Sequence, residues 1–268
     1  MNLEVMLSIM NLKKKQLDSM NITSKCTVIN QCGRNGIEKY KNFNIYSYDE
    51  LGTANSRNRG LEHVTGDIIL LCDDDVVYTE NYEKIVIEEF ENNKEADVIV
   101  FNVENPYRKK KKITEEKRLH IYNSLKYASY NIAFRRKKIK NKNIKFNTRF
   151  GPNANYKSGG DDTIFIVDCL KNKLKIYSSP KNIGKICGNE STWFKGYDEK
   201  YFFDRGALFT EISIRYRKLL ILQHLLRHKE FLQDVKFFTA LKNMLKGSND
   251  YINKYKKGKK VLWRKFYK

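Results

Sequence analysis

The chain has 268 residues, enough for one large α/β domain with an appendage, and its 41% hydrophobic and 13% aromatic content can supply a buried core. This composition excludes a chain that is disordered throughout. The formal net charge is +21, from 52 basic and 31 acidic side chains, and it predicts attraction to polyanions such as nucleic acid, anionic lipid or phosphorylated substrates.

Short β-type segments alternate with helical stretches through the first part of the chain. The predicted strands are Val5–Met10, Cys26–Asn30, Asn44–Tyr48, Asp67–Cys72 and Ala96–Val103. Helical spacing of apolar residues recurs in Lys13–Met20, Asn55–His63 and Asn81–Glu91. Alternation of this kind predicts an α/β fold with a mostly parallel sheet flanked by helices, and with ligands at the carboxyl ends of the strands.

The second half of the chain is predicted to be more helical. Residues 105–145 are the least regular and the most basic part of the sequence. The elements predicted after them are a helix over Asp161–Lys171, a strand over Leu174–Ser178, and helices over Gly206–Arg227 and Phe231–Lys246. Gly247 is expected to stop the last helix. The predicted organisation is a domain over residues 1–210, a helical region over 211–250 and a basic tail over 251–268.

The strongest chemical signal is the triplet Asp73-Asp74-Asp75, which directly follows the apolar strand Asp67–Cys72. That strand is continuously apolar after its first residue, as a strand buried on both faces requires. In an extended segment side chains alternate between faces, so Asp73 and Asp75 are expected to point the same way. Carboxylates at the end of a strand suit Mg²⁺ or Mn²⁺, which complete their shells with water and substrate phosphates. The alternative is a solvated acidic turn.

A glycine-opened turn lies upstream of this triplet and leads into a helix. The turn begins at Gly52, and Arg57 and Arg59 follow within the first turns of the helix. Small residues at a helix start let a nucleotide approach, and guanidinium groups can pair with a diphosphate. Many helices begin in this way, so the motif gains meaning only together with the aspartates.

Together these motifs resemble the family 2 inverting glycosyltransferases of GT-A (Rossmann-like) fold, over about residues 3–210. The segments that carry the resemblance are residues 52–60, Thr65–Leu71 with the Asp-X-Asp triplet, Ser158–Phe165, Glu190–Phe194 and Gly196-Tyr197. The last two are similar to a block in bacterial members that build capsular or O-antigen polysaccharide. The resemblance implies transfer of a sugar from a nucleotide-diphosphate sugar, in the first place a UDP-sugar, to a hydroxyl of a glycan acceptor, with Mn²⁺ or Mg²⁺ as cofactor.

The resemblance also implies roles for individual side chains. Asp75 is expected to bind the metal, and Asp73 the metal shell or the ribose of the donor, with Asp74 beside them on the donor side. Asp162 matches the catalytic base, and Asp161 stands where the family has Glu. Further donor contacts are implied for Asn11, Asn30, Gly52 and Arg57, and acceptor-side roles for Trp193 and Glu190. Many members have a histidine near the metal where this chain has Glu190, so a metal contact of Glu190 stays open. The family commonly has an acidic residue after the second strand, where this chain has Asn30-Gln31-Cys32, so the base of the nucleotide stays open.

Membrane association is a separate expectation, based on charge. The segment after Asp250 has many lysines, interleaved aromatic residues and no acidic residue. It fits a tail that holds the enzyme at the anionic inner face of the cell membrane, where a glycan would grow on a lipid-diphosphate carrier, but it equally fits a solvated extension. No secretory signal or membrane-spanning run is recognisable, and the five cysteines lack disulfide-framework or metal-site spacing. These features predict a cytoplasmic protein.

Two other functions fit parts of the sequence. A basic nucleic-acid-binding protein accounts for the charge but leaves the acidic triplet unexplained, because carboxylates repel phosphate unless a metal lies between them. A metal-dependent nuclease or nucleotidyltransferase needs a further carboxylate for a second ion, and Asp161 or Asp162 could supply it. Nucleic acid is the less expected partner. Release of nucleoside diphosphate from nucleotide sugars distinguishes a glycosyltransferase from both alternatives.

Overall fold

The computed structural model describes residues 1–107, 111–188 and 196–256. The chain divides into two compact units, which we call the sheet unit and the helical unit. The sheet unit comprises Met1–Ala154 and Gly160–Thr192, and the helical unit comprises Asn155–Gly159 and Trp193–Lys268. The unit boundary near residue 192 therefore lies ahead of the domain end that the sequence predicts at residue 210.

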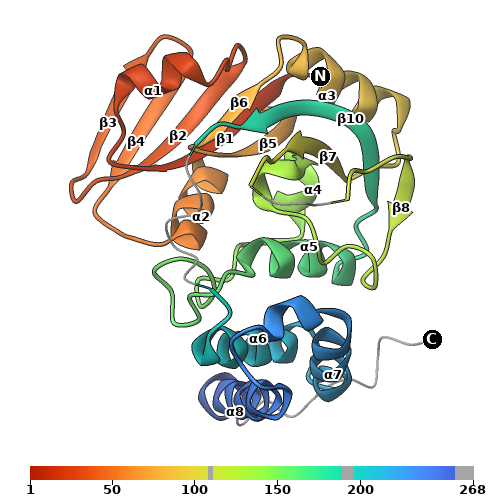
Figure 1. The fold of residues 1–268 in the computed structure, drawn as a ribbon. Coiled ribbons are helices and arrows are strands. Elements are labelled where there is room, and N and C mark those ends of the chain that lie inside the picture. The colour runs from red at the N-terminus through yellow and green to blue at the C-terminus, as the bar shows by residue number, and fades with distance from the viewer. Residues whose placement is uncertain (108–110, 189–195, 257–268) are drawn as a thin grey trace. The chain divides into compact units, whose positions relative to one another are not determined.

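The sheet unit is built on a mixed sheet. Its strands are β1 (Leu3–Met10), β2 (Lys25–Gln31), β3 (Gly36–Tyr40), β4 (Phe43–Tyr48), β5 (Ile68–Asp73), β6 (Val76–Tyr78), β7 (Val98–Glu104), β8 (Lys117–Leu119), β9 (Ile132–Arg135) and β10 (Ile176–Ile186). They lie in the order β3-β4-β2-β1-β5-β9-β7-β10-β6, with β8 paired to β10 (Figure 1). Strands β4, β2, β1 and β5 are parallel, as are β7 and β10, whereas β9 runs antiparallel between β5 and β7. The predicted α/β fold is confirmed.

Helices cover both faces of this sheet, and each face has its own hydrophobic cluster (Figure 1). The helices of the sheet unit are α1 (Lys14–Ser19), α2 (Thr53–His63), α3 (Tyr82–Asn92), α4 (Arg136–Asn141) and α5 (Asp161–Lys171). Helices α1 and α3 contribute to one cluster, and α2, α4 and α5 to the other. Along β5, Leu70 lies in the first cluster and its neighbours Ile69 and Leu71 in the second. This strand is therefore buried on both faces, as its apolar sequence predicts.

The segment predicted to be least regular, residues 105–145, contains more structure than its sequence suggests. It includes β8, the short 3₁₀ helix η1 (Ser129–Asn131), β9 and α4. Strand β9 lies in the middle of the sheet, and Ile132, Ala133 and Phe134 are fully buried. Four residues are too few for a period of two to distinguish this strand from a loop. The strand is also antiparallel to both neighbours, so it falls outside the strand–helix alternation on which the prediction is based. The sequence prediction missed this strand.

The helical unit contains α6 (Glu199–Ile212), α7 (Arg217–Arg227), the 3₁₀ helix η2 (Lys229–Leu232) and α8 (Phe237–Tyr255). The single helix predicted over Gly206–Arg227 is wrong, because the chain leaves helical geometry at Ser213. The Ser213 side-chain oxygen accepts a hydrogen bond from the backbone N–H of Tyr216 at 3.2 Å. A serine that satisfies a local backbone donor in this way favours a break and a new helix start.

Gly247 does not stop a helix, contrary to the sequence prediction, because α8 runs through it to Tyr255. A Cβ at Gly247 would lie 1.8 Å from the carbonyl oxygen of Phe203 on α6, and one at Gly206 would lie 1.9 Å from the carbonyl oxygen of Met244 on α8. The two glycines therefore let the backbones of α6 and α8 approach closely. The predicted basic tail begins inside α8, where Tyr251 is fully buried, and residues 257–268 lie outside the described part of the chain.

Replacing Gly206 by Ala is expected to destabilise the protein by about 1–3 kcal/mol, since the added methyl group forces α6 away from α8. Thermal denaturation of the full chain measures this effect as a lower Tm. Gly36→Ala is the matched control, because a Cβ at Gly36 meets no atom within 4 Å. Equal Tm values for the two variants would contradict the close approach of the helices.

Within these described ranges, no helix has both the length and the apolar character required to cross a membrane.

Candidate active site

The aspartate triplet lies where β5 ends and turns into β6. Asp73 is the last residue of β5, and Asp74 and Asp75 form the turn. The backbone N–H of Cys187 donates to the carbonyl oxygen of Asp75 at 2.7 Å and fixes this turn to the end of β10. Asp74 is exposed, whereas Asp73 and Asp75 are half-buried. Asp73 and Asp75 therefore do not belong to one extended segment, which is the geometry that a common direction of their side chains requires.

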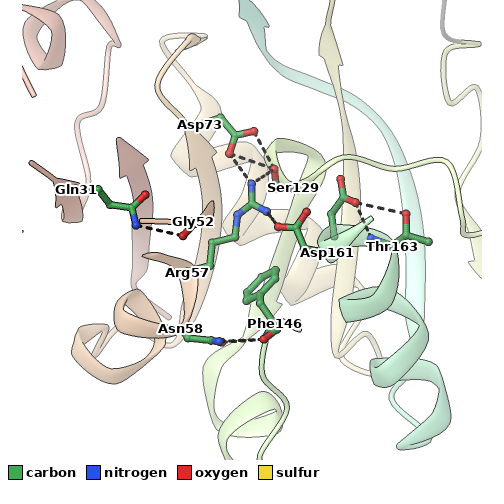
Figure 2. A network of polar contacts seen from close by, with 10 residues as sticks. Gln31, Gly52, Arg57, Asn58, Asp73, Ser129, Phe146, Asp161 and Thr163 are labelled. Atoms are coloured by element: carbon green, nitrogen blue, oxygen red, sulfur yellow. Dashed lines mark hydrogen bonds and ion pairs between the residues drawn. The ribbon is translucent and has the colours of Figure 1, made fainter. Parts of the chain in front are cut away.

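Arg57 connects this strand end to the start of α5 (Figure 2). Its guanidinium Nη1 donates to Asp161 Oδ2 at 2.5 Å, and its Nη2 donates to Asp73 Oδ1 at 2.9 Å. Nη2 also donates to Ser129 Oγ at 2.7 Å, and this hydroxyl in turn contacts both carboxylate oxygens of Asp73, at 3.1 and 2.9 Å. One buried cation therefore lies between two carboxylates from distant parts of the sequence.

The charge of Arg57 is stabilised despite its burial. Only 6% of its side chain is exposed, and burial alone would lower the pKa of the guanidinium. The neighbouring carboxylates of Asp161 and Asp73 outweigh burial and raise the pKa above its usual value. The guanidinium carbon also lies 5.5 Å from the centre of the Phe146 ring, which supports one side of the group. Arg57 is thus a fixed positive charge inside the sheet unit.

The position of Arg57 follows from how α2 begins. Gly52 precedes the helix with φ +111°, a conformation that favours glycine. Its carbonyl oxygen accepts a hydrogen bond from Gln31 Nε2 at 3.2 Å (Figure 2). The same amide nitrogen donates to the carbonyl oxygen of Glu50 at 2.8 Å. Gln31 at the end of β2 therefore holds the turn from which the Arg57 helix starts.

Helix α5 begins with two aspartates in different environments. Gly160 precedes them in a left-handed conformation, with φ +109°. Asp161 is 4% exposed, and burial raises the pKa of its carboxyl to about 6, with Arg57 opposing and Asp162 adding to the shift. A Cβ on Gly151 would lie 3.0 Å from Asp161 Oδ1, so this backbone closes over the carboxylate. Asp162 is more exposed, and its Oδ1 accepts from the backbone N–H of Thr163 at 2.7 Å. Of the two, Asp162 is the carboxylate that solvent reaches.

The residues predicted to contact the nucleotide base lie at the ends of β1 and β2. Asn11 follows β1 with φ +50° and is exposed. Asn30 is buried, and both ends of its amide have partners within the fold. Its Oδ1 accepts from the backbone N–H of Leu12 at 3.0 Å, and its Nδ2 donates to Ser47 Oγ at 3.2 Å. Asn30 therefore ties three strand ends together, and Asn11 is the more accessible of the two.

The structure brings Arg57, Asp73 and Asp161 into direct contact, whereas Glu190 and Trp193 lie outside the described residues. It adds Ser129 and Gln31, which the sequence interpretation did not include. Ser129 has no motif around it. Antiparallel pairing of β9 with β5, in which Ala133 faces Leu70, carries the residues before β9 to the end of β5. Only this strand pairing would have revealed Ser129.

The oxygen ligands at Asp73–Asp75 fit a hard divalent cation. Mg²⁺ and Mn²⁺ bind through one or two carboxylates together with substrate phosphates, so a protein site of few ligands suffices. In the part of the chain that the structure describes, no cluster of three or more His, Cys, Asp or Glu side chains could hold an ion. Of the three aspartates, Arg57 pairs with Asp73 alone.

Residues 33–165 match the family model of Glycosyl transferase family 2. No curated protein matches the chain. Among solved structures, TarS 1–349 of S. aureus in complex with UDP-GlcNAc has a TM-score of 0.66 at 14% identity, over 94% of this chain and 81% of that one. Against the structure of S. aureus TarS itself the TM-score is 0.62 at 14% identity, over 94% of this chain and 49% of that one.

A third similar structure comes from another organism. The mannosyltransferase PcManGT from Pyrobaculum calidifontis, in complex with GDP-Man and Mn²⁺, has a TM-score of 0.52 at 13% identity, over 94% of this chain and 75% of that one. At such low identity these likenesses show the fold, and the family match adds the sequence evidence. Residues 33–165 are therefore similar to glycosyltransferase family 2, and the chain has a GT-A-like α/β fold.

Proposed function

We propose that this protein is an inverting, metal-dependent glycosyltransferase that moves a sugar from a nucleotide-diphosphate sugar to a hydroxyl of a glycan acceptor. The observation that carries the proposal is the Arg57 bridge between Asp73 and Asp161. It ties the aspartate triplet at the end of β5 to the helix start that bears Asp162. The metal-side and base-side carboxylates of the reaction thus belong to one connected structure, in a domain whose family transfers sugars.

Asp162 is the proposed general base. A sugar hydroxyl is a poor nucleophile, so a carboxylate must accept its proton as the new bond forms. The acceptor oxygen bonds to the anomeric carbon, the bond from that carbon to the diphosphate breaks, and the nucleoside diphosphate leaves with the electron pair. Direct displacement inverts the anomeric centre, because base and leaving group lie on opposite faces of the sugar. Exposure of Asp162 and burial of Asp161 support this assignment.

Asp75, together with Asp73, is the proposed holder of Mn²⁺ or Mg²⁺, and Asp74 completes the donor side of the turn. When bound, the ion would offset the negative charge that develops on the departing diphosphate. Arg57 pairs with two carboxylates of the protein, which supports a positioning role for it in place of the diphosphate contact that the family resemblance implies. Asp161 is then the second anchor of this arginine.

The nucleotide of the donor, the acceptor and the cellular compartment are each proposed from a separate observation. The TarS complex contains UDP-GlcNAc, which supports a UDP-sugar, whereas the PcManGT complex contains GDP-Man. The acceptor is proposed to be a surface-polysaccharide glycan on a lipid-diphosphate carrier, in line with the resemblance to bacterial polysaccharide enzymes. All five cysteines are free thiols, three of them buried, which supports a reducing, cytoplasmic environment.

The test is a panel of UDP-, GDP- and dTDP-sugars with Mn²⁺, monitored by thermal shift and by release of nucleoside diphosphate. One nucleotide sugar is expected to raise the Tm in proportion to its affinity and to be turned over. Asp75→Ala should abolish the Mn²⁺-dependent part of the shift, and Glu80→Ala, an exposed carboxylate nearby in sequence, should not. Cleavage of nucleic acid without nucleoside diphosphate release would instead favour a metal-dependent nuclease.

A further inference from the structure

Helix α7 of the helical unit has apolar residues on two faces. Ile221 and Leu225 are buried at 0% and 1% exposure and face the rest of this unit. Leu219, Leu222 and Leu226 are 63%, 42% and 54% exposed. Because they are spaced at i, i+3 and i+7, these three leucines lie along one side of the helix. We call them the leucine stripe. A contiguous exposed apolar patch of this kind marks an interaction surface.

The stripe lies within a strongly cationic segment. Residues 213–229 contain no Asp or Glu, and their basic residues are Arg215, Arg217, Lys218, Arg227 and Lys229. All of these except Arg217 are exposed. Within the described ranges, neither Arg215 nor Lys218 forms an ion pair with a carboxylate. Tyr216 precedes the helix and is 49% exposed, and the Arg215 guanidinium carbon lies over its ring, 5.3 Å from the ring centre. Apolar and cationic side chains are therefore both exposed along this segment.

We propose that α7 binds an anionic lipid surface, with the leucine stripe entering the boundary between headgroups and acyl chains. The flanking cations would meet lipid phosphates, and each basic residue near such a surface adds to the attraction. Self-association is disfavoured, because two copies that paired their stripes would bring two clusters of like charge together. The inference does not depend on the proposed sugar transfer, and it assigns membrane contact to α7 and not to residues 257–268.

The first test compares the full chain and its variants by co-sedimentation with phosphatidylcholine vesicles, with and without phosphatidylglycerol. The wild type should bind only the anionic vesicles, and binding should fall as salt rises. Leu219→Ser/Leu222→Ser/Leu226→Ser should reduce the partition coefficient by at least about tenfold. Its Tm should fall only slightly, because the three side chains are exposed and serine lowers helix propensity modestly. Ile37→Ser, which removes an 81% exposed apolar side chain from β3, is the control that should keep binding.

The second test concerns charge. Arg215→Gln/Lys218→Gln should weaken binding, whereas Lys140→Gln/Lys142→Gln, the same charge change at exposed sites of the sheet unit, should not. A chain truncated after Lys256 should still bind. Absence of binding by the wild type, equal binding to neutral vesicles, or equal losses in variant and control would overturn the proposal. So would loss of binding on truncation. A leucine variant that binds vesicles normally but changes from dimer to monomer in sedimentation velocity would identify α7 as an interface between copies.

Discussion

Asp162→Asn is expected to lower the rate of sugar transfer by about 10²–10⁴-fold, the usual contribution of a general base. An amide cannot take the proton of the acceptor hydroxyl, so the nucleophile stays weak. The substitution should leave the local structure intact, because the amide oxygen can still accept the Thr163 N–H that now binds Asp162 Oδ1 at 2.7 Å. Donor binding, which does not require the base, should be unchanged. Transfer to acceptor and the donor-induced Tm shift, measured on the same sample, separate the two effects.

Asp168→Asn is the matched control for this experiment. Asp168 lies on the same helix and is half-buried. Its Oδ1 is 3.9 Å from Nζ of Lys171 at the surface of α5. We expect its transfer rate to stay close to that of the wild type. Unchanged transfer in Asp162→Asn would refute the assignment of the base. Loss of both transfer and the donor-induced Tm shift would indicate a structural effect of the substitution instead.

Much of the sheet unit is predictable from the sequence because its strands are buried on both faces. The first five residues of β5, Ile68–Cys72, are all apolar, and the structure divides their side chains between two hydrophobic clusters. Strand β9 is also buried on both faces, but it is not predictable in this way. It has only four residues, which is too short for a period to be detected, and it pairs antiparallel with β5 and β7. In the helical unit, glycine at position 247 is a typical helix stop, but here it lies within α8 where the backbone of α6 comes close.

In the candidate site too, groups of residues adjacent in sequence are predictable, whereas contacts between residues distant in sequence are not. The aspartate triplet and the Asp161-Asp162 pair are local motifs, which the sequence alone predicts to be functional. The partner of Arg57 is not local, since Arg57 and Asp161 are 104 residues apart and meet only because α2 and α5 cover the same face of the sheet. Ser129 reaches Asp73 through β9, the strand that was missed. Contacts made through tertiary pairing leave no periodic trace in the sequence.

Arg57→Gln is expected to reduce the free energy of unfolding by about 3–5 kcal/mol at neutral pH, because it leaves the buried carboxylate of Asp161 and the half-buried one of Asp73 without their cation. Arg59→Gln is the matched control on the same helix. Arg59 is 41% exposed and pairs with Glu50 and Glu62 at the surface, where such pairs contribute about 0–1 kcal/mol. Urea denaturation of both variants gives the comparison. A similar small loss for both would mean that Arg57 is not an essential partner of Asp73 and Asp161.

The loss in Arg57→Gln should also depend on pH, with a definite sign. In the wild type the pKa of Asp161 is about 6, above its ordinary value of 3.8, so the folded protein holds this proton more tightly than the unfolded chain. Stability from this group is therefore present below pH 3.8 and is lost as pH rises through 6.

In the Arg57→Gln variant, removing the cation raises the pKa of Asp161 further. The difference between wild type and variant should then be smallest near pH 4 and grow above pH 6, and Asp161→Asn in the Arg57→Gln background should remove most of that growth. A difference that stays constant with pH would show that the arginine acts through packing against Phe146 and not through charge.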